Sequence, residues 1–353
     1  MDLWKIQRKI TSLIFFIEYQ LVNRIKTILL FILLVVLVAA TQFGCSQRQQ
    51  QSGAIDSTFN QTIWVGSGSN QIPYYSRKDG KLIWYGHELI ANTSKYLGPN
   101  GSVLQISNGM NCQNCHLEAG TKPWGNNYSA VFTTYPKFRD RSGEIETIYK
   151  RVNDCIERSL NGQALDTASK EMQAIYAYIK WLGEDLPKGT KPKGSGIVDL
   201  PLMNRAADPL KGNDVYIQKC QTCHGTNGEG QLNLEGTGYT YPPLWGKNSY
   251  NTGAGLFRIT RFAGYVKNNM PQGTDYHAPQ LSDEEAWDVA AFVNSQPRPV
   301  KDLSQDWPNI AKKPFDHPFG PYADPFTEHQ HKYGPFGPIK AYKAQQQKSS
   351  SKP

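Results

Sequence analysis

The sequence predicts a mainly α-helical protein that contains two domains of the same kind. A chain of 353 residues is long enough for two domains. The pattern Cys-X-X-Cys-His occurs twice, at residues 112–116 and 220–224, and each copy lies between two segments with helical periodicity. The 31 Gly and 22 Pro residues indicate long loops between the helices. This composition suits domains whose core is filled partly by something other than side chains.

The first 45 residues indicate a targeting segment rather than part of a domain. Five basic residues precede the apolar run of residues 28–40. A membrane span takes about 20 residues, so thirteen fit the core of a signal peptide better. Cys45 follows in "TQFGC", where a lipid could be attached, although Gln42 stands where such sites prefer Leu. We expect a periplasmic protein, and the sequence leaves open plain cleavage, an uncleaved anchor or a lipid on Cys45.

The charge of the chain favours anionic small molecules over nucleic acid. The formal net charge is +8, and the targeting segment, with five basic and two acidic residues, supplies +3 of it. The remaining +5 is spread along the chain without a long Lys/Arg block, so we expect no nucleic-acid partner.

The two Cys-X-X-Cys-His motifs, "CQNCH" and "CQTCH", predict two covalently bound c-type haems. Two thiols at this spacing can reach the two vinyl groups of one porphyrin, and the adjacent His then faces the iron. The residues concerned are Cys112, Cys115 and His116 in the first motif and Cys220, Cys223 and His224 in the second. A single zinc site made from both Cys pairs is the alternative, but zinc does not require a His after each pair.

The second motif belongs to a predicted domain over residues 191–300. A short helix in "LKGNDVYIQK" precedes the motif, "NNMP" follows it, and an amphipathic helix in "LSDEEAWDVAAFVNSQ" ends the unit. This order resembles a small class I cytochrome c domain. Met270 lies 46 residues after His224, a suitable separation for the distal iron ligand.

The first motif belongs to a predicted domain over residues 46–190, in which Cys155 takes the place of that methionine. The closing helix "ASKEMQAIYAYIKWLG" can be laid over the second one with Tyr178 on Phe292 and Glu171 on Glu285. Met270 then lies 22 residues before Phe292, and Cys155 lies 23 residues before Tyr178. We therefore expect the Cys155 thiolate to be the distal ligand of the first haem and to lower its potential.

Three other residues are weaker candidates for that position. Met172 falls inside the closing helix and is expected in the core, and Met110 precedes the haem motif. His87 lies on an early helix, where surface or packing roles are more common. A lone Cys is itself most often a small buried hydrophobe, and only its register in the duplication argues otherwise.

The segment "SGEIETIYKRVNDCIERSLNG" predicts a helix that begins at Ser142 and ends at Gly162. Its apolar stripe consists of Ile145, Ile148, Val152, Ile156 and Leu160. Arg151, Cys155 and Ser159 follow one another at intervals of four and share one face, which places a guanidinium and a hydroxyl beside the thiolate. Arg139 and Arg141 could close this space, whereas Lys150, Glu157 and Arg158 are expected on a solvated face.

These residues resemble the thiosulfate dehydrogenase family of dihaem cytochromes c, which couple two thiosulfates into tetrathionate. The similar stretches are "RVNDCIERSLNG", "YPKFRDRSG", "YGHELIANTSKYLGPNG", "NCQNCHLEAG" and "NMP", within residues 60–300. The resemblance implies His116 and Cys155 on the catalytic iron, with Arg141, Arg151 and Ser159 at the substrate.

The residues before Met270 depart from some members of this family, which carry a Lys immediately before the distal Met as an alternative ligand. Asn269 occupies that position here, and Lys267 lies two residues further back. A constant His224/Met270 pair is the simpler expectation.

The function expected from the resemblance is the oxidation of two thiosulfates to tetrathionate, with the reverse reduction also open. One alternative is an electron-transfer cytochrome without its own substrate, and another attaches thiosulfate to a carrier protein. The expected partner is a small cytochrome or another redox protein. Residues 301–353 form a Pro- and aromatic-rich tail that should wrap over the haem domains, with about the last ten residues mobile.

Overall fold

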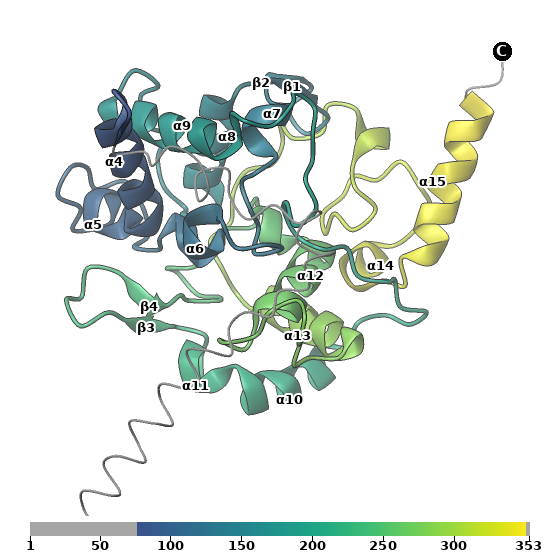
Figure 1. Cartoon of the computed structure of the whole chain (residues 1–353). Coiled ribbons are helices and arrows are strands. Elements are labelled where there is room, and N and C mark those ends of the chain that lie inside the picture. Colours follow the sequence, from purple (N-terminus) through teal and green to yellow (C-terminus); the bar gives the residue numbers. More distant parts are fainter. Residues whose placement is uncertain (1–75, 351–353) are drawn as a thin grey trace, which may run out of the picture. The chain divides into compact units, whose positions relative to one another are not determined.

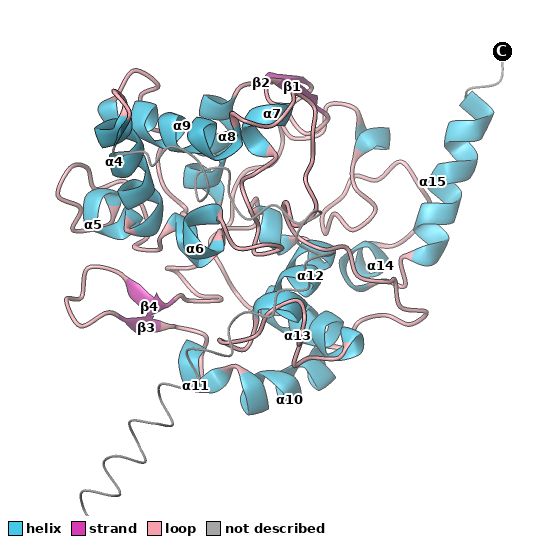
Figure 2. Ribbon diagram, in the orientation of Figure 1, coloured by secondary structure: helices cyan, strands magenta, loops and turns pink. Residues whose placement is uncertain are grey.

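The computed structural model describes residues 76–350, which form a mainly helical structure with two short hairpins (Figures 1 and 2). The predicted targeting segment 1–45, including Cys45, lies outside the described residues. Within the described part of the chain, none of the helices has the length and apolar character needed to span a bilayer.

The first haem-motif domain is built around two packed helices, α4 and α9. Its elements are α4 (Gly80–Ala91), α5 (Thr93–Leu97), η2 (Cys112–Asn114), α6 (Leu117–Gly120), α7 (Val131–Thr134), β1 (Lys137–Arg139), β2 (Glu144–Glu146), α8 (Ile148–Arg158) and α9 (Lys170–Gly183). The β1–β2 hairpin is antiparallel and leads directly into α8.

The second domain repeats this plan with α10 and α13. Its elements are α10 (Pro209–Lys219), α11 (Gln221–His224), β3 (Gln231–Leu232), β4 (Tyr239–Tyr241), η3 (Gly255–Phe257), α12 (Ile259–Asn269) and α13 (Asp283–Ser295). Ser282 and Glu285 form a capping box at the start of α13, as its sequence favours.

The crossing of the two long helices confirms the internal duplication. In the first domain a Cβ on Gly86 would lie 2.0 Å from the Ala174 oxygen and 2.8 Å from the Tyr178 Cβ. In the second, a Cβ on Gly212 would lie 1.9 Å from the Asp288 oxygen and 2.8 Å from the Phe292 Cβ. Glycine is required at both crossings because no side chain fits there, and Tyr178 corresponds to Phe292 as the sequence predicts.

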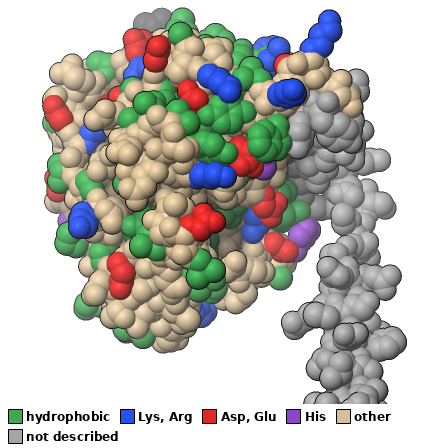
Figure 3. Space-filling model, turned by 90° about the vertical axis from the view of Figure 1, so that its left-hand side faces the viewer, with side chains coloured by type: hydrophobic (Ala, Val, Ile, Leu, Met, Phe, Trp, Pro, Cys, Tyr) green, Lys and Arg blue, Asp and Glu red, His purple; other side chains and the backbone are tan. Residues whose placement is uncertain are grey.

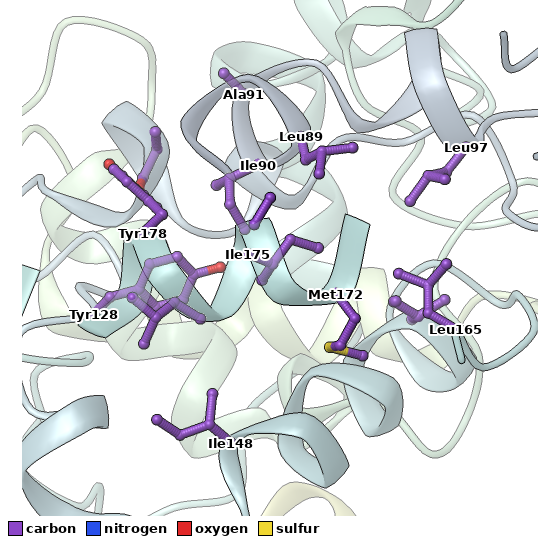
Figure 4. Close-up of a cluster of buried hydrophobic side chains, with 14 of the residues drawn as sticks. Leu89, Ile90, Ala91, Leu97, Tyr128, Ile148, Leu165, Met172, Ile175 and Tyr178 are labelled. Carbon is purple, nitrogen blue, oxygen red and sulfur yellow. The ribbon is translucent and has the colours of Figure 1, made fainter. Parts of the chain in front are cut away.

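Each domain has its own hydrophobic core. In the first, α4, α8 and α9 supply most of the buried side chains labelled in Figure 4, including Leu89, Ile148 and Ile175. Met172 is fully buried within this cluster, which agrees with its predicted role in the core. The second core gathers around Trp287 and Phe262 from α13 and α12.

The predicted helix 142–162 is wrong at its start. Residues 144–146 form strand β2, Gly143 adopts a φ of +71° in the hairpin turn, and Ile145 is 70% exposed. The helix begins instead at Ile148, where the Thr147 side chain accepts a hydrogen bond from the Lys150 amide. The hairpin forms here instead of a helix because it buries the Glu146 carboxylate. Ser142 donates a hydrogen bond to that carboxylate, and Arg139 lies 3.8 Å from it.

The tail contacts both haem domains, in agreement with the prediction. It contains η4 (Ile310–Lys312), α14 (Glu328–Tyr333) and α15 (Gly337–Ser350). Phe336 and Ile339 are buried in the second core, and the Asp306 carboxylate pairs with Arg158 of the first domain. The last described residues belong to α15, which continues up to Ser350 because residues 339–350 lack Pro and Gly and are rich in Ala, Lys and Gln.

Candidate functional site

Two cavities hold the residues predicted for the two haems. The first, of about 460 Å³, is lined by both cysteines and the histidine of motif 112–116 and by Cys155. The second, of about 470 Å³, is lined by both cysteines and the histidine of motif 220–224 and by Met270. The structure therefore places a thiol or a thioether in the same cavity as each proximal histidine.

Both proximal histidines are oriented in the manner of metal ligands. Nδ1 of His116 lies 2.6 Å from the Asn126 backbone oxygen, and Nδ1 of His224 lies 2.8 Å from the Pro242 oxygen. Since a carbonyl can only accept, each Nδ1 carries the proton and each Nε2 carries the lone pair that binds iron. The Asn126 side-chain nitrogen lies 3.3 Å from Nε2 of His116, a contact that iron would replace. Burial lowers the pKa of His116 to about 4 and also lowers the pKa of His224, so both rings are neutral, as iron ligation requires.

The zinc alternative has no support in the described structure. Among residues 76–350, no group of three or more His, Cys, Asp or Glu side chains lies close enough to hold a metal ion. The two Cys pairs thus remain separate, although Cys115 of the first pair also lines the second cavity. These features fit two covalent haems, one in each domain.

Met270 follows the last residue of α12, and its neighbours are held away from the iron position. Asn269 is buried, and its amide donates to the backbone oxygens of Tyr265 and Trp124. Lys267 donates to the Leu281 oxygen at 2.7 Å and pairs with Asp283 at 2.8 Å. The structure thus offers Met270, rather than Asn269 or Lys267, to the second haem.

The other methionine and histidine candidates lie elsewhere. Met110 is buried and lines the second cavity rather than the first. His87 lies on α4 with its ring edge against Tyr178, at 5.5 Å between centroids, and is not part of the first cavity wall. Cys155 is therefore the best-placed distal ligand for the first haem among the candidates that the sequence offered.

A third cavity, of about 380 Å³, adjoins the first haem cavity at Cys155 and is here named the arginine cavity. Arg151, Cys155 and Ser159 line both spaces, as their shared face on α8 predicts. The arginine cavity has six arginines and two aspartates in its wall: Arg139, Arg141, Arg151, Arg158, Arg258, Arg261, Asp154 and Asp306. These eight side chains sum to +4, and the carboxylates of Glu146, Asp199 and Asp316, which pair with arginines of this wall, reduce the sum to +1. The remaining positive charge suits an anion.

Carboxylates pair with five of the six arginines. Arg139 and Arg141 face Glu146, Arg141 also pairs with Asp154, and Arg158, Arg258 and Arg261 pair with Asp306, Asp316 and Asp199. No ion pair or hydrogen bond joins the Arg151 side chain to another residue of the described range 76–350. The nearby Cys155 thiolate is the main cause that raises the pKa of Arg151. Arg151 is therefore a permanent cation that is free to bind an anion.

Arg141 lies at the predicted place but is less free than Arg151. Its guanidinium contacts Asp154 and lies 3.7 Å from Glu146, and burial lowers its pKa. Its backbone oxygen also accepts a hydrogen bond from the Trp307 amide. Arg141 thus joins the hairpin, α8 and the tail around the cavity.

The expectation that Arg158 lies on a solvated face is wrong. Its side chain is buried and donates two hydrogen bonds, of 2.7 and 2.8 Å, to the Asp306 carboxylate. The tail covers this side of α8, which the periodicity of α8 alone could not reveal. Glu157 pairs with Lys301 of the tail at 3.4 Å, and Lys150 stays exposed beside Asp154.

The tail and α12 supply cavity residues that the sequence did not single out. They are Arg258, Arg261, Asp306, Trp307 and His317. All of them lie about 100 residues or more beyond Cys155 in the chain. The aromatic content of the tail was the only signal for this role. On the face shown in Figure 3, basic and acidic side chains are interspersed, in contrast to the gathered arginines of the cavity.

Several known proteins have sequences similar to this chain. Residues 104–187 match the SoxA/TsdA cytochrome c domain family, and residues 210–297 match the cytochrome c family. The chain is 40% identical over 237 residues to a thiosulfate dehydrogenase of Psychrobacter arcticus. This alignment covers 65% of this chain and 68% of the relative. It is 34% identical over 273 residues to a thiosulfate dehydrogenase of Stutzerimonas stutzeri, covering 76% and 86% of the two chains.

A solved structure is also similar. The thiosulfate dehydrogenase TsdBA from Marichromatium purpuratum, in its as-isolated form, aligns with a TM-score of 0.62 and 29% sequence identity. The alignment covers 70% of this chain and 52% of that one, so this chain spans about half of the solved protein.

Proposed function

Since the chain belongs to the thiosulfate dehydrogenase family of cytochromes c, we propose that it joins two thiosulfate ions into tetrathionate. A bond forms between the two terminal sulfur atoms, and two electrons leave. The same site can run in reverse, in which case two electrons cleave that bond in tetrathionate.

The observation that carries this proposal is the arginine cavity beside Cys155. Six guanidinium groups around one small space lower the repulsion between two dianions that must approach each other, and carboxylates offset the charge of five of them. Arg151 supplies a cation that has no carboxylate partner within residues 76–350, and Ser159 lines the same wall. We assign to both residues the binding of substrate oxygens, with Arg141 supporting the wall from the hairpin.

Two c-type haems are the cofactors of this chain, and each can take up one electron. Cys112, Cys115, Cys220 and Cys223 hold them covalently, and we assign His116 and Cys155 to the first iron and His224 and Met270 to the second. Cys115 lines both haem cavities as well as the arginine cavity. Leu256 lines the second haem cavity and the arginine cavity. The two haem sites therefore meet at Cys115, which supports direct electron transfer between them.

A cytochrome that only transfers electrons is the second candidate, and it explains the haem residues equally well. It gives no reason for a cavity with six arginines next to Cys155. A cytochrome that attaches thiosulfate to a carrier protein needs the same anion site but also a channel for the carrier. The small volume of the arginine cavity, about 380 Å³, favours free small anions.

Turnover in both directions tests the proposed function. The purified dihaem protein is assayed with thiosulfate and an artificial electron acceptor, and with tetrathionate and an artificial donor, without any other protein. Formation or cleavage of tetrathionate supports the proposal. If artificial donors reduce the haems but neither sulfur compound is turned over, the proposed function is wrong and the protein is a cytochrome that only transfers electrons.

For localisation and partners, we propose export to the periplasm, where c-type haem is attached. The support is the sequence of residues 1–45, which lie outside the described structure. Electrons would pass from the second haem to a small cytochrome or another redox protein.

A further inference from the structure

Lys137 and Lys191 are cations of the first haem cavity that the proposed function does not use. Both lysines line that cavity, and neither lines the arginine cavity. Three arginines, in contrast, line both spaces: Arg139, Arg151 and Arg261. No carboxylate of the described residues 76–350 pairs with either lysine. Lys191 is exposed, whereas Lys137 is half-buried, so Lys137 is the charge that calls for a partner.

The Lys137 side chain leaves strand β1 on its covered face. Successive residues of a strand point to opposite sides, and Phe138, the next residue, is 61% exposed. The Lys137 ammonium lies over the ring of Tyr135, with Nζ 4.5 Å from the ring centroid. Burial lowers the pKa of Lys137 to about 8, and the nearby charges of Arg139 and Lys191 lower it further. The ammonium therefore lies among like charges at the wall of the first haem cavity.

Tyr135 brings an unused hydroxyl to the same place. Its side chain is only 6% exposed and lines the first haem cavity but not the arginine cavity. The hydroxyl makes no hydrogen bond within residues 76–350, and unlike the Tyr322 hydroxyl it is not shut off by protein atoms. Burial raises the pKa of Tyr135, and the charges of Arg151 and Arg139 oppose this shift. Since both arginines line the first haem cavity, the hydroxyl opens on that cavity.

An ammonium and a hydroxyl that meet at one aromatic ring suit a carboxylate, which can accept from both. A c-type haem carries two propionate carboxylates, on the porphyrin edge opposite the two groups that the cysteines bind. In Figure 1 the hairpin that carries Lys137 is separated from α6, which directly follows the first Cys pair. We propose that Lys137 and Tyr135 together bind a propionate of the first haem, with Lys191 adding positive charge at this edge of the cavity.

The second haem cavity offers no comparable pair among the described residues. Lys219 is the one lysine in its wall, and it pairs with Glu285 at 2.9 Å. Glu118 lines the same wall and adds a negative charge. The inference therefore concerns the first haem alone, and the second haem serves as an internal reference in its test.

A spectroscopic redox titration of the protein with both haems, without any sulfur compound, tests this inference. Reduction adds a negative charge to the haem, and a propionate that has lost its cation opposes it. In Lys137→Met the ratio of reduced to oxidised first haem at a fixed potential should fall roughly 3- to 10-fold. Tyr135→Phe removes a hydrogen bond but no charge and should give a smaller fall. The second haem should keep its wild-type ratio in both variants.

Lys188→Met is the matched control. The Lys188 ammonium also lies over an aromatic ring of the first domain, 3.7 Å from the centroid of Phe132, but Lys188 is not part of the haem cavity wall. This variant should titrate like the wild type. Lys137→Arg keeps a cation at the site and should keep most of the wild-type ratio, which a role of Lys137 in packing alone would not predict.

The inference is wrong if Lys137→Met leaves the first haem unchanged. A raised KM for thiosulfate in that variant, with an unchanged redox ratio, would assign the lysine to substrate entry instead. A crystal structure of the wild type with both haems decides even if the variants do not fold. The inference requires propionate oxygens about 2.5–3.2 Å from both Nζ of Lys137 and the Tyr135 hydroxyl, and propionates held by other side chains overturn it. None of these results depends on whether the protein turns over thiosulfate.

Discussion

Arg151 lies one helical turn before Cys155 on α8, and both side chains line the wall shared by the first haem cavity and the arginine cavity. The thiolate of Cys155 is the main cause of the raised pKa of Arg151. The pair thus places a permanent positive charge next to the sulfur that we assign to the first iron. A substrate anion attracted to Arg151 is brought to that sulfur by the geometry of one helix.

Arg151→Leu should damage turnover far more than folding. The loss of this charge-assisted contact should cost about 2–4 kcal/mol at the transition state, or roughly 30- to 1000-fold in kcat/KM. Lys150→Leu, on the same helix but exposed, is the control and should keep its activity. Steady-state kinetics with thiosulfate and haem quantification check both variants. Near-normal turnover of Arg151→Leu would mean that the cavity binds its substrate through other groups.

Asp306→Asn should loosen the tail from α8. The Asp306 and Arg158 side chains are each only 11% exposed, so removing one charge leaves the other buried and unpaired. We expect a loss of about 3–5 kcal/mol in the free energy of unfolding, measured by denaturant titration. Glu157→Gln breaks a more exposed pair with Lys301 and should cost only about 0–1 kcal/mol. Equal losses in the two variants would argue against the buried pair as the main anchor of the tail.

His317→Asn should weaken the pH dependence of stability on the acid side. Burial, followed by the charge of Lys313, lowers the pKa of His317 to about 4, against about 6.5 in the unfolded chain. Between these two values the unfolded state binds a proton that the folded state does not. The wild type therefore loses stability as the pH falls from about 6.5 to 4, by up to about 3 kcal/mol from this group, and loses none from it above that range.

In His317→Asn this part of the acid loss should be absent. The exposed His329 lies in the same tail, and His329→Asn is the control that should keep the wild-type pH profile. Unfolding midpoints measured from pH 4 to 8 provide the comparison. Parallel profiles for all three proteins would show that His317 does not remain neutral in the folded state.

Met270→Leu should lower the potential of the second haem and leave the first unchanged, because a thioether ligand raises the potential of its iron. Met110→Leu is a matched control: Met110 lines the same cavity and is not assigned to the iron. Both substitutions roughly conserve side-chain volume. A spectroscopic redox titration separates the two haems. A shift of the low-potential haem in Met270→Leu would contradict the assignment of ligands to haems.

Features encoded by short spacings were predicted well from the sequence. The haem-binding motifs lie within five residues, and the shared face of Arg151, Cys155 and Ser159 follows from the α-helical repeat. The register between the two domains also held, since Gly86 and Gly212 contact equivalent positions on α9 and α13.

Contacts between distant segments could not be predicted in this way. Nothing near Arg158 indicates that Asp306 pairs with it. Apart from its aromatic content, nothing in the tail indicates that Trp307 reaches the cavity. The start of α8 was misplaced for a similar reason. The three-residue spacing of Ile145 and Ile148 fits a helix, but the buried carboxylate of Glu146 and the turn at Gly143 favour a hairpin.

The ligation of the first iron by Cys155 is the central claim, and electron paramagnetic resonance of the oxidised protein tests it most directly. The wild type should show a low-spin signal of the His/thiolate type. Cys155→Gly should lose that signal while it keeps both haems, because Cys112, Cys115, Cys220 and Cys223 attach them, and it should no longer couple thiosulfate. If the signal is absent from the wild type, or persists in Cys155→Gly, then Cys155 is not the distal ligand.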